Sequence, residues 1–248
     1  LVGEHLVIPA QVTCAGDDRT YTVTGIGERF MYRNHTIKTV ELPDSVTYVE
    51  ASAFTEAGML ESIRIPENLE RVEDRGFSQM GYYEPYAGEW KTDTLIIPET
   101  MKTWGPSIFA NGKFRRVVIS EGVERIGYSA FGGMRDLTSV VLPESLKEIG
   151  AHAFGDCTEI ADLTLPKNLE YIGDSAFQYI SMETLVLPES VWHVGSRAFG
   201  TLGYGDTAGK WVGPATVQLN GKLRSLGWNS FRGDADITAV LNSQRNMV

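Results

Sequence analysis

The sequence lacks any long apolar run and is short of basic residues. No stretch of about 18 apolar residues occurs in its 248 positions, so we expect no membrane-spanning helix. Lysine and arginine number 22 against 32 aspartate and glutamate residues, which gives a net charge of −10 and a pI of about 4.9. Nucleic acid and bare anionic membranes repel such a chain. We therefore expect neither nucleic-acid binding nor direct membrane insertion.

Sequence motifs for catalysis and metal binding are also missing. There is no HExxH, CxxC or G-x-S-x-G motif and no glycine-rich phosphate loop. The four histidines, His5, His35, His152 and His193, lie far apart in the chain. We therefore expect a protein that is not an enzyme, has no catalytic residues, binds no metal and uses no cofactor.

What the sequence does contain is one short pattern that repeats. A turn residue, usually proline, is followed eleven residues later by phenylalanine in eight places: Pro43 to Phe54, Pro66 to Phe77, Pro98 to Phe109, Ser120 to Phe131, Pro143 to Phe154, Pro166 to Phe177, Pro188 to Phe199 and Asn220 to Phe231. Successive turn residues are 22 or 23 positions apart, except for two steps of 32. A constant period of this size predicts similar units stacked side by side. The interpretation is a single domain over 1–248 with about nine units of 22–23 residues and insertions at 78–92 and 200–213.

Each unit alternates apolar and polar residues in the manner of a strand with one buried face. In the seventh unit Leu163 and Leu165 flank Thr164. Pro166, which has no N–H to give to a sheet, then marks the end of the strand. A small alanine directly before the phenylalanine predicts a narrow interior layer that holds one bulky side chain from each unit.

A glycine follows the turn residue by seven positions in most units. The position holds Gly105, Gly127, Gly150, Gly173, Gly195 and Gly227, but Glu50 and Glu73 occupy it in two units. Because two glutamates stand there, we expect the position to tolerate a side chain and not to need a positive φ.

The two cysteines, Cys14 and Cys157, fall in the first and sixth units. Five unit steps at ~4.8 Å between strands separate them by roughly 24 Å. A disulfide needs Cα atoms within about 7 Å of each other. We expect both thiols to be free, so the cysteines give no information on the compartment.

The repeated pattern L-x-x-L-x-L-P-x-x-L-x-x-I-G-x-x-A-F-x-x-C, over about residues 1–242, resembles the BspA-like, treponemal-type leucine-rich repeats of bacterial surface proteins. The resemblance implies an α/β-type repeat solenoid. This is a right-handed superhelix with a parallel sheet of short strands on its concave face and turns or short helices on its convex face. It also implies an exported protein, extracellular or at the cell surface after removal of a signal peptide, although the opening LVGEHLVIPA shows no such peptide. Some members are adhesins, so the implied partner is a host or extracellular protein of the matrix type or a glycan.

The two insertions carry aromatic residues that a solenoid does not need. These are Tyr82, Tyr83, Tyr86 and Trp90 in the first insertion and Tyr204 and Trp211 in the second, with Trp192 shortly before it. Aromatic side chains on loops are typical of binding surfaces, which predicts ligand binding here. The alternative is that the insertions pack against the solenoid.

Outward-facing strand residues give a second candidate surface. Ile96, Val118, Val141 and Val186 form an apolar row that Thr164 interrupts. An exposed apolar patch often marks an interface, but β-branched residues also simply suit a strand.

A nearly all-acidic row directly follows the turn residues. It consists of Asp44, Glu67, Glu99, Glu121, Glu144, Lys167 and Glu189. Calcium needs about six to eight oxygens in one cage, which a line of carboxylates does not supply. We expect these residues to be solvated parts of the turns.

Two functions remain open for such a chain. One is an adhesin-like binding module, and the other is a structural spacer that presents another domain and has no ligand of its own. A glycan-processing enzyme would need two carboxyl groups facing each other across a cleft, which the linear acidic row does not provide.

Overall fold

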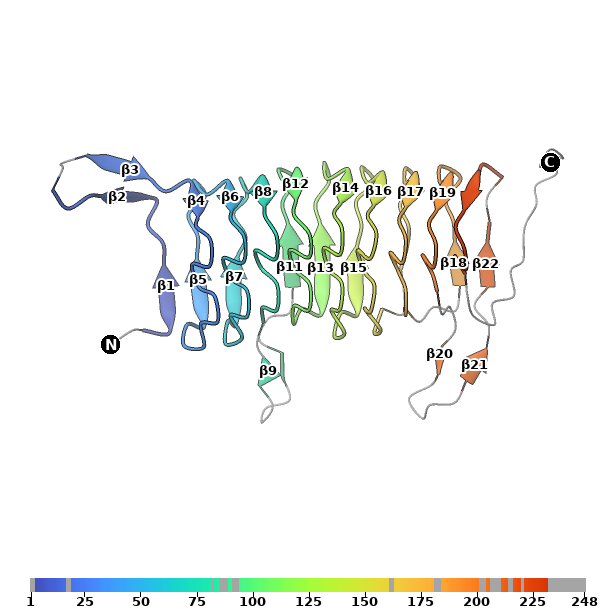
Figure 1. The fold of residues 1–248 in the computed structure, drawn as a ribbon, viewed down its shortest axis with the longest axis horizontal. Helices are drawn as coiled ribbons and strands as arrows, with labels where there is room; N and C mark the ends of the chain where they lie inside the picture. Colours follow the sequence, from blue (N-terminus) through green and yellow to red (C-terminus); the bar gives the residue numbers. More distant parts are fainter. Residues whose placement is uncertain are drawn as a thin grey trace.

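The computed structural model describes residues 3–16, 19–81, 83–84, 89–90, 94–160, 163–180, 184–200, 204–205, 211–213, 216–219 and 221–231. Within these ranges every regular element is a β-strand, and the short strands of successive units lie side by side in one stack (Figure 1). This confirms the repeat solenoid. The resemblance implied turns or short helices on the convex side. The described residues contain turns and no helix.

A first row of strands runs along one side of the stack. Its strands are β1 (His5–Val7), β5 (Thr39–Glu41), β7 (Ser62–Arg64), β11 (Thr94–Ile97), β13 (Arg116–Ile119), β15 (Ser139–Val141), β18 (Thr184–Val186) and β22 (Thr216–Gln218). They pair in parallel as three sheets, β1-β5-β7, β11-β13-β15 and β18-β22. The first break, between β7 and β11, lies where the first insertion enters the chain.

A second row of parallel strands was not expected from the sequence. It contains β4 (Gly25–Ile26), β6 (Tyr48–Val49), β8 (Arg71–Val72), β12 (Thr103–Trp104), β14 (Arg125–Ile126), β16 (Glu148–Ile149), β17 (Tyr171–Ile172), β19 (His193–Val194) and β23 (Ser225–Leu226). These form the sheets β4-β6-β8-β12 and β14-β16-β17-β19-β23. Strands of two residues show no alternating pattern in a sequence, so only the repetition of a buried Ile or Val marks them.

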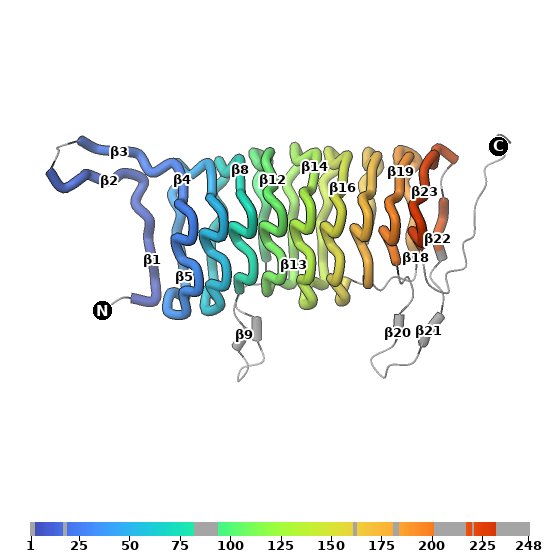
Figure 2. Tube along the Cα trace, viewed as in Figure 1, coloured from blue at the N-terminus to red at the C-terminus, as the bar shows by residue number. Residues whose placement is uncertain are grey.

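Among the described residues, the remaining strands form three antiparallel hairpins. They pair β2 (Gln11–Thr13) with β3 (Thr20–Thr22), β9 (Tyr83–Glu84) with β10 (Glu89–Trp90), and β20 (Tyr204–Gly205) with β21 (Trp211–Gly213). The β2–β3 hairpin extends from the N-terminal end of a series of similar coils, each coil being one unit (Figure 2).

Turns around the phenylalanine form the third side of each coil. The residues two positions before and two positions after it adopt positive φ, as Ser52 (φ 56) and Glu56 (φ 58) do around Phe54. This conformation costs about 1–2 kcal/mol for a non-glycine residue. Backbone hydrogen bonds to the next unit offset that cost: Ser52 donates to the carbonyl of Asp74 at 2.9 Å, and Phe54 to that of Gly76 at 2.8 Å.

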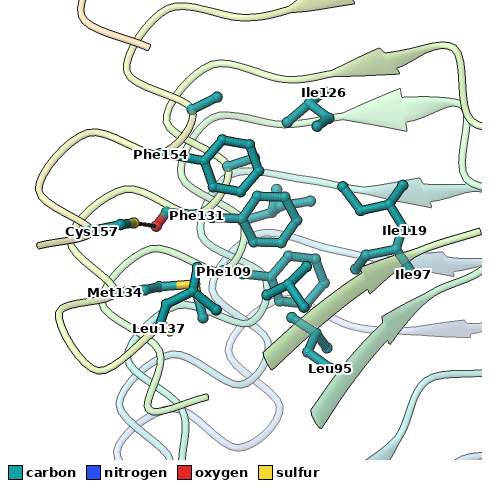
Figure 3. Packing of buried hydrophobic residues seen from close by; sticks show 14 of the residues in the cluster. Leu95, Ile97, Phe109, Ile119, Ile126, Phe131, Met134, Leu137, Phe154 and Cys157 are labelled. Carbon is teal, nitrogen blue, oxygen red and sulfur yellow. Dashed lines mark hydrogen bonds between the residues drawn. The ribbon is translucent and has the colours of Figure 1, made fainter. Parts of the chain in front are cut away.

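The phenylalanine side chains themselves form a continuous ladder inside the stack. Rings of neighbouring units, from Phe54 to Phe231, lie 5.1–5.7 Å apart between centroids and within 12° of parallel. Figure 3 shows Phe109, Phe131 and Phe154 stacked in this way, with Ile97 and Ile119 of the first row facing them. An alanine precedes five of the eight rings and is fully buried each time, as expected for a narrow layer. Before Phe109, however, the bulkier Ile108 is also fully buried, so the layer is not narrow in every unit.

The glycine seven positions after the turn residue is more restricted than its sequence suggested. None of these glycines has a positive φ, which agrees with the expectation. A Cβ atom at Gly173, however, would lie 2.5 Å from the backbone nitrogen of Ala151, and one at Gly227 would lie 2.2 Å from that of Ser196. The expectation that the position tolerates a side chain is therefore wrong at these units, because the backbones of neighbouring coils touch there.

Replacing a central ring of the ladder should destabilise the whole protein. Phe154 is fully buried between Phe131 and Phe177 at 5.1 and 5.4 Å, so Phe154→Ala should lower the free energy of unfolding by about 3–5 kcal/mol. Phe30, 46% exposed at the end of the ladder, is the control, and Phe30→Ala should cost about 1 kcal/mol. Equal losses in urea denaturation would contradict the ladder as the main source of stability.

Adding one methyl group at the coil contact should also destabilise. Gly173→Ala pushes Cβ into backbone atoms that cannot move independently, and we expect a loss of about 1–3 kcal/mol. Gly27 fills the same position in the first unit with its nearest neighbour, Glu50 Oε2, 3.9 Å away. Gly27→Ala should change the thermal midpoint little, and a similar drop for both variants would refute the close-contact explanation.

Candidate functional site

Both insertions form short antiparallel hairpins at the backbone level. The β9–β10 hairpin pairs Tyr83 with Trp90, and the β20–β21 hairpin pairs Tyr204 with Gly213. Both hairpins leave the stack at the same edge (Figure 1). The side chains of the six predicted aromatic residues, Tyr82, Tyr83, Tyr86, Trp90, Tyr204 and Trp211, lie outside the described part of the structure. Binding at the insertions therefore stays a prediction.

Trp192 belongs to an aromatic cluster on the second row of strands. The rings of Tyr171 and His193 stack at 4.4 Å with an interplanar angle of 5°. The Trp192 ring lies 6.0 Å from Tyr171 and 5.6 Å from His193 and is 42% exposed. We refer to these three residues as the Trp192 cluster. The sequence singled out Trp192, but Tyr171 lies beside His193 and Trp192 only because β17 pairs with β19.

The predicted apolar row lies on the outward face of the first row of strands. Ile96 pairs with Val118 and Val118 with Val141, so these three lie side by side. Ile96, Val141 and Val186 are 57%, 41% and 54% exposed, and Val118 is half-buried. In the described chain, the seventh unit forms no strand of the first row: Leu163 to Leu165, expected to be a strand, have no regular structure. The structure therefore brings three of the four residues together and leaves Val186 separate.

The N-terminal end of the first row of strands carries charged residues and a cavity. A cavity of about 420 Å³ is lined by His5, Glu41 and Arg64 among others. His5 lies 3.4 Å from the Glu41 carboxylate, and Arg64 contacts Asp44. These pairs are exposed and contribute little to stability.

The acidic row has a structural explanation that differs from simple solvation. The Glu121 carboxylate accepts hydrogen bonds from the backbone N–H groups of Glu144 at 2.9 Å and Ser145 at 3.2 Å. One unit later, the Glu144 carboxylate accepts from the N–H of Lys167 at 3.3 Å. The carboxylate of one turn thus holds the next turn, and the described residues contain no cluster of three potential metal ligands.

A second ladder of polar side chains escaped the sequence analysis. Hydroxyl or amide groups two positions after the turn residue donate to backbone carbonyls of the preceding unit, at Ser45, Asn68, Thr100, Ser145, Asn168 and Ser190. When the units are aligned on the turn residue, this position holds Ser, Thr or Asn in six of the eight units and Gly122 and Lys222 in the other two, so a sequence signal was present.

A polar groove along the turn side also escaped the sequence analysis. Its volume is about 620 Å³, and it follows the turns from Arg29 to Asp156. Tyr128, 54% exposed, packs edge-on against His152 on its wall, with ring centroids 5.7 Å apart. No catalytic pattern marks this groove. Its signal in the sequence is a run of small residues at one position of consecutive units, directly after the phenylalanine.

The two thiols occupy opposite environments. Cys14 is exposed and Cys157 is buried, and both are free. Cys157 donates to the carbonyl of Phe131 at 3.2 Å (Figure 3), and burial in an apolar layer raises the pKa of its thiol to about 12. A thiol that stays protonated at neutral pH is a poor nucleophile.

These short parallel strands, stacked around one ladder of apolar residues, define a leucine-rich-repeat solenoid. The chain belongs to the family described as the BspA-type leucine-rich repeat region, which matches residues 19–86 and 82–202 in six copies. No curated protein matches the chain. No described helix is long and apolar enough to cross a membrane.

Several solved structures are similar to this chain, and two of them illustrate the shared fold. A leucine-rich repeat protein from Bacteroides ovatus is 22% identical with a TM-score of 0.59, over 90% of this chain and 59% of that one. A leucine-rich cell surface protein from Faecalibacterium prausnitzii is 18% identical with a TM-score of 0.53, over 90% of this chain and 65% of that one. This chain therefore spans about three fifths of the length of these structures.

The difference between the thiols predicts selective alkylation. In the native protein at pH 8, iodoacetamide should modify Cys14 and leave Cys157 unmodified, because the Cys157 thiol is buried and its pKa of about 12 keeps it protonated. Both should react in denaturant, and mass spectrometry of peptides distinguishes them. Rapid native labelling of Cys157 would contradict its placement in the core.

Proposed function

We propose that this protein is a non-enzymatic binding module of the bacterial cell surface that engages an extracellular protein through the Trp192 cluster. The observation that carries the proposal is the presence of an exposed tryptophan at a position that is otherwise polar. The equivalent residues of the other units are Thr24, Thr47, Glu70, Lys102, Glu124, Lys147, Glu170 and Arg224.

The solenoid does not need an aromatic residue at that position. Its core residues occupy other positions of the unit, and the polar residues at the same position in the other units serve the stack equally well. An indole group that is 42% exposed costs solubility without adding to the core. Tryptophan and tyrosine are also the residues most enriched among those that dominate binding energy at protein interfaces.

The Trp192 cluster is held rigidly before any partner arrives. The backbone N–H of Trp192 donates to the carbonyl of Glu170 at 3.1 Å, and the carbonyl of Trp192 accepts from the backbone N–H groups of Arg224 at 2.9 Å and Ser225 at 3.1 Å. These bonds fix the backbone, and the contacts between the three rings restrict their side chains. Side chains that are ordered before binding lose little conformational entropy when a partner binds. A protein surface of the matrix type, with apolar and hydrogen-bonding groups in one patch, suits such a cluster.

Two further observations support the location at the cell surface and the lack of enzymatic activity. A solved relative of the same fold is a cell surface protein, although only 18% identical. The described residues contain no cluster of metal ligands and place the one buried thiol, Cys157, in a form unsuited to nucleophilic attack.

The test is binding of the purified chain to immobilised collagen, fibronectin and laminin by surface plasmon resonance. Trp192→Ala should weaken capture of the bound partner at least tenfold, since removal of a central aromatic anchor typically costs about 2 kcal/mol or more. Lys102→Ala, at the same position of another unit, is the control and should bind like the parent.

Both variants should keep the parent thermal midpoint, because neither side chain is part of the core. Absence of binding to all three proteins, or equal binding by Trp192→Ala, would refute the proposal. The first of these results would favour the alternative of a spacer that presents another domain.

A further inference from the structure

The groove on the turn side is built by one position of the repeat. The residue directly after the phenylalanine is small in five consecutive units, where it is Thr55, Ser78, Ala110, Gly132 and Gly155. In the unit before these five the position holds the large Tyr32, and in the unit after them it holds Gln178. The turn that contains Gln178 and the turns that follow it do not line the groove. The groove therefore has two ends and a length of four unit steps, roughly 20 Å at ~4.8 Å for each step.

The floor of the groove is closed and polar. Thr55 and Ser78 are 5% and 2% exposed, and the Thr55 hydroxyl donates to the carbonyl of Arg75 at 2.6 Å. Ser78, Ser107 and Ser129 also line the groove and add hydroxyl groups to it. A groove lined by hydroxyl groups favours a ligand that brings its own hydrogen-bonding groups.

The backbone of the turns is not available to that ligand. The N–H groups of Phe54, Phe77 and Phe109 each donate to the next unit at 2.8 Å. An extended peptide binds a sheet mainly through main-chain hydrogen bonds at a free edge, and the turn side offers no free edge within the groove. A peptide also repeats every ~3.3–3.6 Å, whereas the rings beneath the groove repeat every 5.1–5.6 Å.

The charges of the groove balance. Two guanidinium groups, Arg29 and Arg75, and two carboxylates, Glu56 and Asp156, line it. Three of these charges are also paired with residues outside the groove: Arg29 lies 3.5 Å from Glu28, Arg75 3.8 Å from Asp74 and Glu56 2.7 Å from Arg33. A polyanion or a polycation would find as much repulsion as attraction in such a groove. The matching ligand is therefore polar and uncharged.

We propose that this groove binds a linear, neutral oligosaccharide. Sugar hydroxyls both donate and accept, as do the serine and threonine hydroxyls and the amides of Gln79 and Asn111 that line the groove. Tyr128, 54% exposed on the wall, supplies an aromatic face for stacking. The groove shares no residue with the Trp192 cluster, so this inference goes beyond the proposed protein-binding function and does not depend on it.

Titration calorimetry with neutral hexasaccharides tests the inference. The probes are hexamers of β-1,4-linked glucose, xylose, mannose and N-acetylglucosamine and of α-1,4-linked glucose, with a hyaluronan hexasaccharide as the anionic comparison. At least one neutral hexamer should bind, and its disaccharide should bind at least tenfold more weakly, because the groove is several sugars long.

Two variants locate the binding site. Tyr128→Ala should weaken binding roughly tenfold through loss of the aromatic wall. Gln79→Gly removes an amide while keeping a residue that accepts the positive φ of 55° at that position. Tyr179→Gly is the matched control, since Tyr179 has the same place in its turn with φ 67° and lies outside the groove.

The outcomes separate this inference from the protein-binding proposal. Trp192→Ala should keep full sugar affinity, and Tyr128→Ala should keep full protein affinity. The sugar proposal is overturned if no neutral hexamer binds, if only hyaluronan or an extended peptide binds, or if Tyr179→Gly weakens binding as much as Tyr128→Ala.

Discussion

Everything in this structure depends on the contact between the phenylalanine rings of neighbouring units. The rings stack at 5.1–5.7 Å along the whole ladder, and the backbone bonds of the turns keep the same register. A unit that lengthened the segment between its turn residue and its phenylalanine would lose both contacts. This explains why that distance is eleven residues in all eight cases. Extra residues enter only after the phenylalanine, where the chain has left the ladder.

The same packing constraint determines which positions of the unit can change their residue type without disturbing the stack. Residues that point into the coil or touch the next backbone, such as Phe154 and Gly173, are fixed by packing. Each unit also has positions whose side chains point outward, and the stack does not require a particular residue at these positions. A change at one such position adds a chemical group without disturbing the stack, as Trp192 does on the second row of strands.

Much of the fold followed from the sequence, because buried positions recur with the repeat. Leu163, Leu165 and Phe177 were predicted to face inward and are buried. The second row of strands was missed because two-residue strands leave no periodic signal. The prediction for the glycine position was wrong because Gly173 lies close to Ala151 of the neighbouring coil. Comparing the residue types at this position in the aligned units does not show how two coils contact each other.

The candidate surfaces were harder to predict than the fold. Exposure of Ile96 followed from its place in the strand, whereas Trp192 was singled out only because it lies shortly before the second insertion. The contact of Trp192 with Tyr171 depends on strand pairing, which the sequence did not predict. The groove was missed for the opposite reason. Its signal is a lack of side chains at Gly132 and Gly155, whereas a search for function in a sequence looks for reactive or aromatic groups.

The two proposed surfaces are independent because of how a stack transmits change. Each unit contacts only its neighbours, so a substitution is felt mainly by the adjacent coils. Tyr128 lies in the fifth unit and Trp192 in the eighth, with two complete units between them. A solenoid of this kind can thus carry separate binding surfaces on different sides and at different heights. A globular core of the same size would couple them, since its buried residues share one set of contacts.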